Sequence, residues 1–595
     1  MMLTSTRIDE QGNIRFRITI VFILVLVLCA IIVGRLFQKQ IVQHDHYETL
    51  AYNQRYKEEK IPSARGEIFV NDIYSDNLYP LVTNKTFWAV LVVPNQVTDP
   101  DKLATGLGPI IGVEPVKILQ LLSENKLYIP PLKHKLDDNQ RKAIEALDLN
   151  GVMLLPEAYR DYPEGNMGAK FLGFVDNNGD GKYGIEGYLN DTLKGKYGES
   201  IGEKDIFGRQ ITAVDSKVTL PKNGKDVILT VDRVIQFMAE KAIKTAVEKH
   251  QADSGSVVIM DPRTGGVLAL AEYPTFDPAN YTEVKQEDYG VFKCLAASDD
   301  YESGSVFKAV AMAAGIDAGA VTPDTGETFD ANVKVDDYVI WNSERKPYGY
   351  ETMTQVMENS DNVGMVWMMD KLGEENFYKY LEKFKFGELT GIEIDGESPG
   401  IVKDREYLPH VDLSTMSFGQ GINVTEMQLL QAMGAIANGG LLVRPTLVKG
   451  YIDKDGKEEK VQPKILGRVL SESSAADIGG MLVSVIERGH GKQAQVKGYR
   501  IGGKTGTAQI PLKDRRGYEA DKFTGSFYGF GPVDNPSFTM IVRINVPKDV
   551  IWAESTAAPV FGELAKGILN YYQIAPDQEW AQEQDRIKRE LQLKK

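Results

Sequence analysis

The sequence predicts a multidomain α+β protein with a single N-terminal transmembrane helix. Three observations support this prediction. The 595 residues are too many for one compact core, and the contents of 43% hydrophobic and 25% charged residues are ordinary for globular chains. Residues 18–34 form an uncharged apolar run. Apolar residues at helical spacing alternate with strand-like runs over much of the remaining chain.

The apolar run from Ile18 to Gly34, extended past Arg35 to residue 37, is long enough to cross a membrane. At about 1.5 Å per residue, it just spans a hydrocarbon core of about 30 Å. Three arginines precede it: Arg7, Arg15 and Arg17. They favour a cytoplasmic N-terminus at 1–17, a helix at 18–37 and the remainder outside the cytoplasm. A cleaved signal peptide is the alternative, but its apolar core would be shorter and no A-x-A site follows.

Charge and composition exclude several classes of function. The net charge of −15 disfavours a nucleic-acid partner, which requires a basic surface. Cys29 lies in the apolar run and Cys294 far from it, so we expect no disulfide and a buried, unreactive Cys294. Among six histidines no HExxH pair occurs, and His44 and His46 would share a face only in an extended strand. We therefore expect neither a metal nor a cofactor.

The pattern of elements changes near residue 225. Residues 38–225 indicate mixed strands and helices, and Asn223-Gly224 predicts a hairpin between 214–220 and 227–231. We place a domain boundary at 225/226, a second domain over 226–572 and a charged tail at 573–595. In that domain we expect helices at 231–247, 427–438 and 558–571, and strands at 256–260, 267–271, 523–530 and 538–546, with turns at 261–266 and 533–536.

The first of three short motifs is Ser305-Val306-Phe307-Lys308, followed by an alanine-rich helix former. Residues three apart share a helix face, so Lys308 is expected beside Ser305. A serine hydroxyl is a weak nucleophile until a base removes its proton. Lysine can be that base if burial and a neighbouring positive charge lower its pKa. The pattern therefore indicates a Ser305 nucleophile with a Lys308 base.

Two further motifs follow in the same domain. Ser360-Asp361-Asn362 offers a second hydroxyl that can relay a proton, and an amide that can hold a substrate amide. Lys504-Thr505-Gly506-Thr507 reads as an exposed strand beside the site. Its lysine supplies positive charge, its threonines can bind a carboxylate, Gly506 leaves room for close approach, and an extended peptide can add to the strand edge.

Each motif alone is weak, but all three in this order form the signature of penicillin-binding proteins and serine β-lactamases. The sequence resembles class B penicillin-binding proteins more widely. Lys504–Gln509 matches their KTGTAQ form, and three stretches look like their non-catalytic pedestal: Arg65-Gly66, Arg160-Asp161-Tyr162-Pro163 and Gly184-Ile185-Glu186. The resemblance covers about residues 60–570. One departure is Ser303, where the family usually has proline, which should loosen the turn before the helix.

The resemblance implies an anchor, a β-rich pedestal at 38–225, and a transpeptidase domain with an antiparallel sheet flanked by helices, like that of serine β-lactamases. It implies that Ser305 is acylated by the D-Ala-D-Ala end of a peptidoglycan stem peptide, while Lys308, Ser360, Asn362 and Lys504 are catalytic. The backbone N–H groups of Ser305 and Thr507 would form the oxyanion hole. Asp361, Thr505, Gly506 and Thr507 would bind substrate.

The same resemblance implies further ligands and partners. An amine from a neighbouring stem peptide would attack the acyl-enzyme, and β-lactam antibiotics would trap Ser305. A polytopic lipid-II glycosyltransferase of the SEDS type and other cell-wall synthesis or division proteins are expected partners at the bacterial inner membrane. The alternatives are a D,D-carboxypeptidase or β-lactamase, in which water replaces the amine, and a membrane β-lactam sensor or scaffold. The role in division or elongation stays open.

Two other motifs are interpreted as structural. Gly198-Glu199-Ser200-Ile201-Gly202 matches the G-x-S-x-G nucleophile elbow, but its flanks are polar, so we expect a surface turn. Residues 176–181 begin like a calcium loop, but Gly187 stands where the required glutamate should be, which favours a simple turn. Trp341, Tyr348 and Tyr350 could border a substrate groove or pack.

Overall fold

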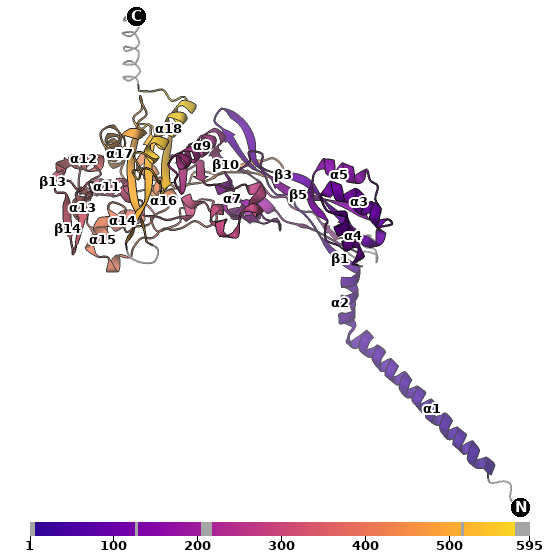
Figure 1. The fold of residues 1–595 in the computed structure, drawn as a ribbon. Coiled ribbons are helices and arrows are strands. Elements are labelled where there is room, and N and C mark those ends of the chain that lie inside the picture. The colour runs from indigo at the N-terminus through magenta and orange to yellow at the C-terminus, as the bar shows by residue number, and fades with distance from the viewer. Residues whose placement is uncertain (1–5, 125–128, 204–216, 513–516, 578–595) are drawn as a thin grey trace, which may run out of the picture. The chain divides into compact units, whose positions relative to one another are not determined.

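The computed structural model describes residues 6–124, 129–203, 217–512 and 517–577 (Figure 1). The chain forms two compact units. One contains Met1–Ala64 and Gly195–Asn223, and the other contains Arg65–Lys194 and Gly224–Lys595. Of the predicted charged tail at 573–595, only residues 573–577 are among those described.

The first unit joins an apolar helix to a small sheet. Helix α1 (Thr6–Phe37) continues through a π-helical turn (Gln38–Val42) to α2 (His44–Arg55). Within the described residues, Ile14–Val42 is the one helix long and apolar enough to cross a membrane, which agrees with the predicted span. Strands β1 (Tyr56–Ile61), β8 (Gly198–Glu203) and β9 (Lys217–Thr219) form an antiparallel sheet in the order β1-β8-β9.

Two turn predictions in this region are wrong. Gly198–Gly202 is not a surface turn but most of the central strand β8, because its backbone pairs with strands on both sides. The nucleophile elbow is disfavoured as well, since the described chain continues as strand β8 from Ser200 to Glu203. Asn223-Gly224 does not close a hairpin, because β9 pairs with β8 while β10 (Asp226–Asp232) belongs to a sheet of the second unit.

The second unit begins with a mixed sheet that draws strands from both sides of residue 225. Its order is β19 (Glu458–Lys460), β18 (Val448–Ile452), β10, β2 (Ile68–Asp72), β3 (Ser75–Val92) and β4 (Lys133–Leu136), with β5 (Val152–Asp161) also paired to β3. Only the β10–β2 pair is parallel among these described strands. A small apolar core joins β3 and β4 to α3 (Pro100–Ile111), α4 (Pro115–Ser123) and α5 (Asp138–Glu145).

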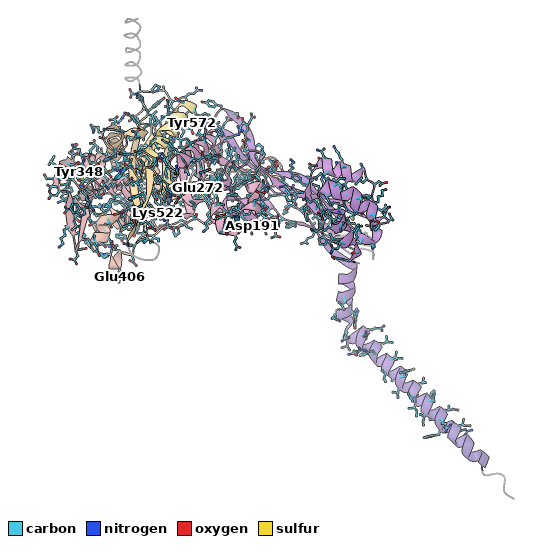
Figure 2. All side chains as sticks on the ribbon, viewed as in Figure 1. Asp191, Glu272, Tyr348, Glu406, Lys522 and Tyr572 are labelled. Atoms are coloured by element: carbon cyan, nitrogen blue, oxygen red, sulfur yellow. The ribbon has the colours of Figure 1, made fainter. Side chains whose placement is uncertain are left out.

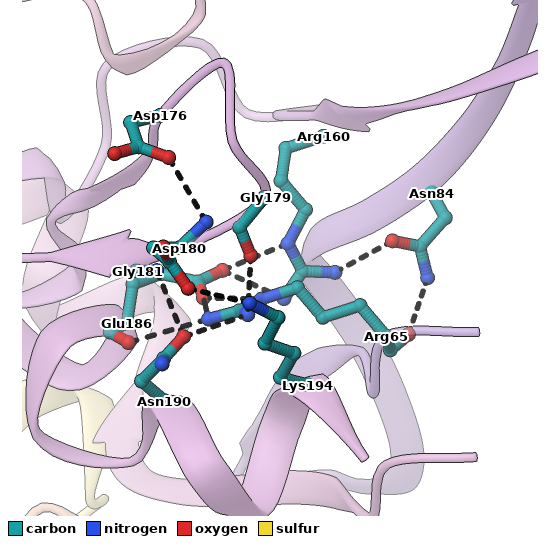
Figure 3. A network of polar contacts seen from close by, with 10 residues as sticks. All are labelled: Arg65, Asn84, Arg160, Asp176, Gly179, Asp180, Gly181, Glu186, Asn190 and Lys194. Carbon is teal, nitrogen blue, oxygen red and sulfur yellow. Dashed lines mark hydrogen bonds and ion pairs between the residues drawn. The ribbon is translucent and has the colours of Figure 1, made fainter. Parts of the chain in front are cut away.

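A buried ion network holds this part together (Figure 3). Glu186, on α7 (Gly184–Tyr188), is 0% exposed and accepts hydrogen bonds from Arg65 Nε and Arg160 Nε, each at 2.8 Å. Arg160 Nη1 also donates to Asn84 Oδ1 at 2.9 Å, and Asn84 Nδ2 donates to the Arg65 carbonyl at 2.6 Å. One carboxylate thus fixes two arginines that lie 95 residues apart in sequence, and removing it would leave buried charge unpaired.

A five-stranded antiparallel sheet forms the centre of the region that carries the three motifs. Its order is β12 (Val267–Tyr273), β11 (Ser254–Met260), β23 (Phe538–Asn545), β22 (Tyr518–Gly531) and β21 (Gly502–Pro511). Because side chains alternate along a strand, β11 sends Val257 and Ile259 to one core and Val258 and Met260 to the other. The predicted strands are confirmed, and β21 is an edge strand.

Helices cover both faces of this sheet (Figure 1). Helices α9 (Arg233–Lys249) and α18 (Ala557–Tyr571) pack on one face, and α16 (Glu426–Ala437) packs on the other. All three agree with predicted helices to within two residues. Beyond α16 lies a helical region with α11 (Lys308–Asp317), α12 (Met353–Glu358), α13 (Asn362–Leu372) and α17 (Glu472–Glu487).

The remaining elements are short connections. The helices are α6 (Ala169–Leu172), α8 (Asn190–Lys194), α10 (Leu295–Ser298), α14 (Glu374–Lys383) and α15 (His410–Met416). Short 3₁₀ helices lie at Pro94–Gln96, Pro278–Glu283, Gln286–Phe292, Gly304–Val306, Arg405–Tyr407 and Lys492–Ala494. The two-stranded pairs are β6 (Phe174–Val175) with β7 (Gly181–Lys182), β13 (Gly326–Phe329) with β16 (Gly349–Thr352), β14 (Asn332–Val335) with β15 (Tyr338–Trp341), and β17 (Leu441–Val443) with β20 (Ile465–Arg468).

Candidate active site

All three motifs meet at one cavity of about 260 Å³ in the second unit. Ser305, Ser360, Thr505 and Thr507 line it, and they come from three distant parts of the chain. The other lining residues are Ser343, Glu344, His490, Trp552, Ala553 and Glu554. The prediction that these motifs share a site is confirmed in its geometry.

Ser305 lies in the helical turn Gly304–Val306, immediately before α11. Gly304 has a φ of +59°, which glycine adopts without strain. The alanine-rich sequence that follows favours the buried helix α11. Gly506 lets strand β21 approach this turn, since a Cβ there would lie 2.8 Å from the Ser303 carbonyl oxygen. Ser303 has a φ of −76°, which proline also adopts, and its hydroxyl is buried without a hydrogen-bond partner.

Lys308 is fully buried at the start of α11. Its Nζ donates to the Ser360 carbonyl at 2.6 Å, to Ser360 Oγ at 3.2 Å and to Asn362 Oδ1 at 2.8 Å. Burial, and then the positive charge of Lys504, lower the pKa of Lys308 well below its usual value, while Asp361 opposes them. Burial and a neighbouring positive charge are the two causes expected from the sequence to make a lysine a base.

Ser360 joins the two lysines. It occupies the link between α12 and α13 with a φ of +54°, an uncommon conformation for serine that costs about 1–3 kcal/mol. Lys504 Nζ donates to Ser360 Oγ at 3.0 Å and to the Thr505 carbonyl at 3.0 Å. Lys504 is 0% exposed, and burial lowers its pKa to about 7. The strand edge is where the sequence predicts it, but the lysine side chain is buried, not exposed.

Asp361 and Asn362 have structural contacts that explain their positions. Asp361 is 0% exposed and caps α13, with Oδ1 accepting from the Gly364 N–H at 2.9 Å. Helix capping holds this side chain in the interior, and its role in substrate binding stays a prediction. Asn362 Nδ2 donates to the Trp341 carbonyl at 2.9 Å, so Asn362 links Lys308 to the neighbouring loop.

Two threonines of β21 border the cavity. Thr507 Oγ1 accepts a hydrogen bond from the Ala553 N–H at 3.1 Å, which leaves its hydroxyl hydrogen available to a ligand. Thr505 is 7% exposed and lines the same cavity. Ser305 and Thr507 both face the cavity from elements that Gly506 holds in contact.

The far rim of the cavity was not predicted. His490 Nδ1 lies 3.1 Å from Glu554 Oε2, and Glu344 and Trp552 stand nearby in the lining. These residues come from loops without a recognisable motif. Of the three aromatic residues left open, Trp341 and Tyr350 are exposed and Tyr348 is partly buried, and none lines this cavity. Tyr348 lies in the region of α12 and α13 (Figures 1 and 2).

Other predictions concern residues away from the cavity. The loop at 176–181 is a turn, as expected, with Asp176 Oδ1 accepting from the N–H groups of Asn178 and Asp180. Cys294 is 3% exposed, and burial raises the pKa of its thiol, which agrees with an unreactive cysteine. His44, Asp45 and Glu48 lie close together on α2, but they are exposed, and such groups are common without an ion.

Comparison with known proteins supports this arrangement. Residues 255–566 match the penicillin binding protein transpeptidase domain, and residues 60–229 match the penicillin-binding protein dimerisation domain. Stage V sporulation protein D of Bacillus subtilis is 33% identical over 95% of this chain and 87% of its own length. Peptidoglycan D,D-transpeptidase FtsI of Escherichia coli is 27% identical over 96% of this chain and 94% of its own length.

A crystal structure of penicillin binding protein 3 from Mycobacterium tuberculosis, complexed with aztreonam, superposes with a TM-score of 0.67. It shares 25% identity and covers 87% of this chain and 98% of the solved chain. A sheet flanked by helices, with a serine and two buried lysines at its edge strand, defines a serine-type penicillin-recognising domain. The chain belongs to the class B penicillin-binding proteins, which pair this domain with a dimerisation domain.

Proposed function

We propose that this protein is a membrane-anchored peptidoglycan D,D-transpeptidase that works through a Ser305 acyl-enzyme. The observation that carries the proposal is the environment of Lys308. This lysine is fully buried, and the positive charge of a second lysine, Lys504, acts on it. Such a site favours the neutral amine, which can accept a proton from the nearby serine.

In the first step, Ser305 Oγ attacks the carbonyl carbon of the penultimate D-Ala of a stem peptide. Lys308 takes the hydroxyl proton as the new C–O bond forms. The backbone N–H groups of Ser305 and Thr507 stabilise the oxyanion, a contribution of about 3 kcal/mol for one such donor. The C–N bond then breaks and the terminal D-Ala leaves with a proton.

The contacts of Ser360 support a role in delivering that proton. Its hydroxyl lies within hydrogen-bonding distance of both Lys308 Nζ and Lys504 Nζ, at 3.2 Å and 3.0 Å. A proton accepted by Lys308 can therefore pass to the leaving nitrogen through Ser360. Microscopic reversal of the same route would deprotonate the incoming acceptor amine during deacylation.

Substrate is held by the edge strand β21. An extended peptide can pair with this edge, while the hydroxyls of Thr505 and Thr507 bind the terminal carboxylate. Because Lys504 is buried, it acts on the carboxylate through its field and through Ser360, not by direct contact. β-Lactam antibiotics, as mimics of the D-Ala-D-Ala end, would acylate the same serine.

The proposal extends to the arrangement in the cell. The helix at Ile14–Val42 anchors the chain in the inner membrane, and the arginines before it place the N-terminus in the cytoplasm. Residues 38–225 act as pedestal and 226–572 as the transpeptidase domain outside the cytoplasm. A polytopic lipid-II glycosyltransferase of the SEDS type is the expected partner, because it would supply the glycan strands to be cross-linked.

Two experiments test the proposal. Mass spectrometry after exposure to a β-lactam should map one adduct to the peptide that contains Ser305. Ser305→Ala should abolish the adduct without unfolding the protein, and Lys308→Ala should suppress it strongly. Incubation with a stem-peptide donor and an amine acceptor should then give a cross-linked product. Hydrolysis of the donor without any cross-linked product would contradict transpeptidation and favour a carboxypeptidase.

A further inference from the structure

Two buried carboxyl groups, one of them within the second motif, are not used by the proposed mechanism. Glu351, on β16, is 3% exposed, and Asp361, at the start of α13, is 0% exposed. Glu351 Oε1 accepts a short hydrogen bond from Asn359 Nδ2, and Asp361 Oδ1 accepts from the Gly364 N–H. Their other oxygens, Glu351 Oε2 and Asp361 Oδ2, are buried and have no hydrogen-bond partner.

One proton on one of the two carboxyl groups would give both unpartnered oxygens a hydrogen-bond partner, namely each other. Two carboxylates can only accept hydrogen bonds, whereas a protonated carboxyl group can also donate one. Two like charges in one buried site cannot both ionise readily. Burial first of all, together with the nearby charge of Asp361, raises the pKa of Glu351 to about 7, although the hydrogen bond from Asn359 acts in the opposite direction. Asp361 is the member that caps a helix N-terminus, where negative charge is favoured.

We propose that Glu351 is a positioning residue for Lys308: it is protonated in the active enzyme and donates a hydrogen bond to the Asp361 carboxylate. The inference rests on the proposed role of Lys308 as base. Asp361 already raises the pKa of Lys308 against the effects of burial and Lys504. A second negative charge on Glu351 would add to this effect and favour the lysine form that cannot accept a proton.

The pair also affects the position of Asn362. Asp361 caps α13, the first residue of that helix is Asn362, and Asn362 Oδ1 accepts from Lys308 Nζ at 2.8 Å. Ionisation of Glu351 would place two carboxylates against each other and displace the cap. The base would then lose its alignment as well as its lowered pKa.

The other titratable groups that face Glu351 do not neutralise a negative charge on it. Glu358 faces it from α12 but is paired with Arg488 at 2.9 Å. Glu327 lies directly opposite on β13 and is exposed, and Tyr348 has its pKa raised to about 12, mainly by burial. Within the described part of the chain, no cationic side chain forms an ion pair with either carboxyl group of the pair.

The test compares two substitutions of similar length, of which one keeps a polar group that can donate a hydrogen bond and the other does not. Glu351→Gln keeps a donor of the same shape but cannot ionise, and Glu351→Met keeps the length without a donor. The rate of Ser305 labelling by a fluorescent penicillin is measured from mildly acidic to mildly alkaline pH. Glu240→Gln is the matched control, because Glu240 is another, partly buried carboxyl group with a raised pKa that contacts Gln236 and Gly168 instead.

On the acidic side of the profile, Glu351→Gln should stay within about threefold of wild type, whereas Glu351→Met should be about tenfold slower. At alkaline pH, Glu351→Gln should retain more of its labelling rate than wild type does, because it cannot ionise. The titration of Lys504 affects every variant alike. The Glu240→Gln profile should match wild type. The loss in Glu351→Met should appear in the acylation rate constant, with non-covalent affinity unchanged.

Coincident profiles for wild type and both Glu351 variants would overturn the inference. Equal losses in Glu351→Gln and Glu351→Met, accompanied by equally lowered melting temperatures, would also overturn it and leave a packing role only. These results are distinct from failure of the proposed function. If wild-type labelling does not map to Ser305, the proposed mechanism fails before the Glu351 variants are compared.

Discussion

The substitution Gly506→Ala tests how closely strand β21 must approach the nucleophile. A Cβ at this position would lie 2.7 Å from Val306 Cγ2, 2.8 Å from the Ser303 carbonyl oxygen and 2.9 Å from the Val306 nitrogen. Contacting carbon atoms are normally separated by at least about 3.5 Å, so the strand or the turn must move by about 0.8 Å. Two of the three close atoms are backbone, which cannot rotate away.

This displacement has two separate costs. Overpacking a well-packed site destabilises a protein by about 1–3 kcal/mol, which this chain should survive. The functional cost is larger, because the movement separates Ser305 from Thr507, the two residues proposed to form the oxyanion hole. A misplacement of about 1 Å can cost about 100-fold in rate. Gly506→Ala should therefore be folded but acylated about 100-fold more slowly.

The assay is the second-order rate of labelling by a fluorescent penicillin, measured beside the thermal unfolding of the same preparation. Gly480→Ala, on α17, is the matched control, because a Cβ there meets no atom within 4 Å. It should label at the wild-type rate and be slightly more stable, since alanine is the better helix former. Wild-type labelling by folded Gly506→Ala would refute the argument that this contact sets the oxyanion geometry.

Two more predictions follow from buried charges. Glu186→Gln should lower the free energy of unfolding by about 3 kcal/mol in a urea titration, because Arg65 and Arg160 lose the charge that pairs them; an unchanged midpoint would show that the network is not stabilising. Lys504 has a folded pKa of about 7, below that of an unfolded lysine, so the unfolded state binds more protons between the two values. Stability should therefore rise as the pH increases from about 7, and Lys504→Met should flatten that slope in thermal melts at successive pH values.

The sequence predicts best those features that depend on local spacing. Ser305 and Lys308 are three residues apart, so one helical turn sets their relation whatever the rest of the chain does. The strands of the five-stranded sheet are predictable because their apolar runs are continuous and bounded by turn residues. The capping role of Asp361 also had a local signal, since aspartate before a helix is a preferred N-cap.

Features that depend on distant packing were not predictable. Lys504 lies in a polar, glycine-flanked stretch that indicates an exposed strand, but in the fold its side chain is buried against Ser360, which is 144 residues away in sequence. His490, Trp552 and Glu554 reach the cavity from separate loops that carry no periodic pattern. The Asn223-Gly224 prediction failed for a related reason, because the flanking strands found partners in different sheets.

The two lysines need not act alike, and the structure separates their roles by environment. Both are fully buried, but the positive charge of Lys504 acts on Lys308 in addition to burial. The charge of Lys504 therefore favours the neutral form of Lys308, which is the form that the proposed mechanism requires of its base. Lys504 Nζ also donates a hydrogen bond to Ser360 Oγ, so the proposed base and the proposed relay hydroxyl depend on the same buried lysine.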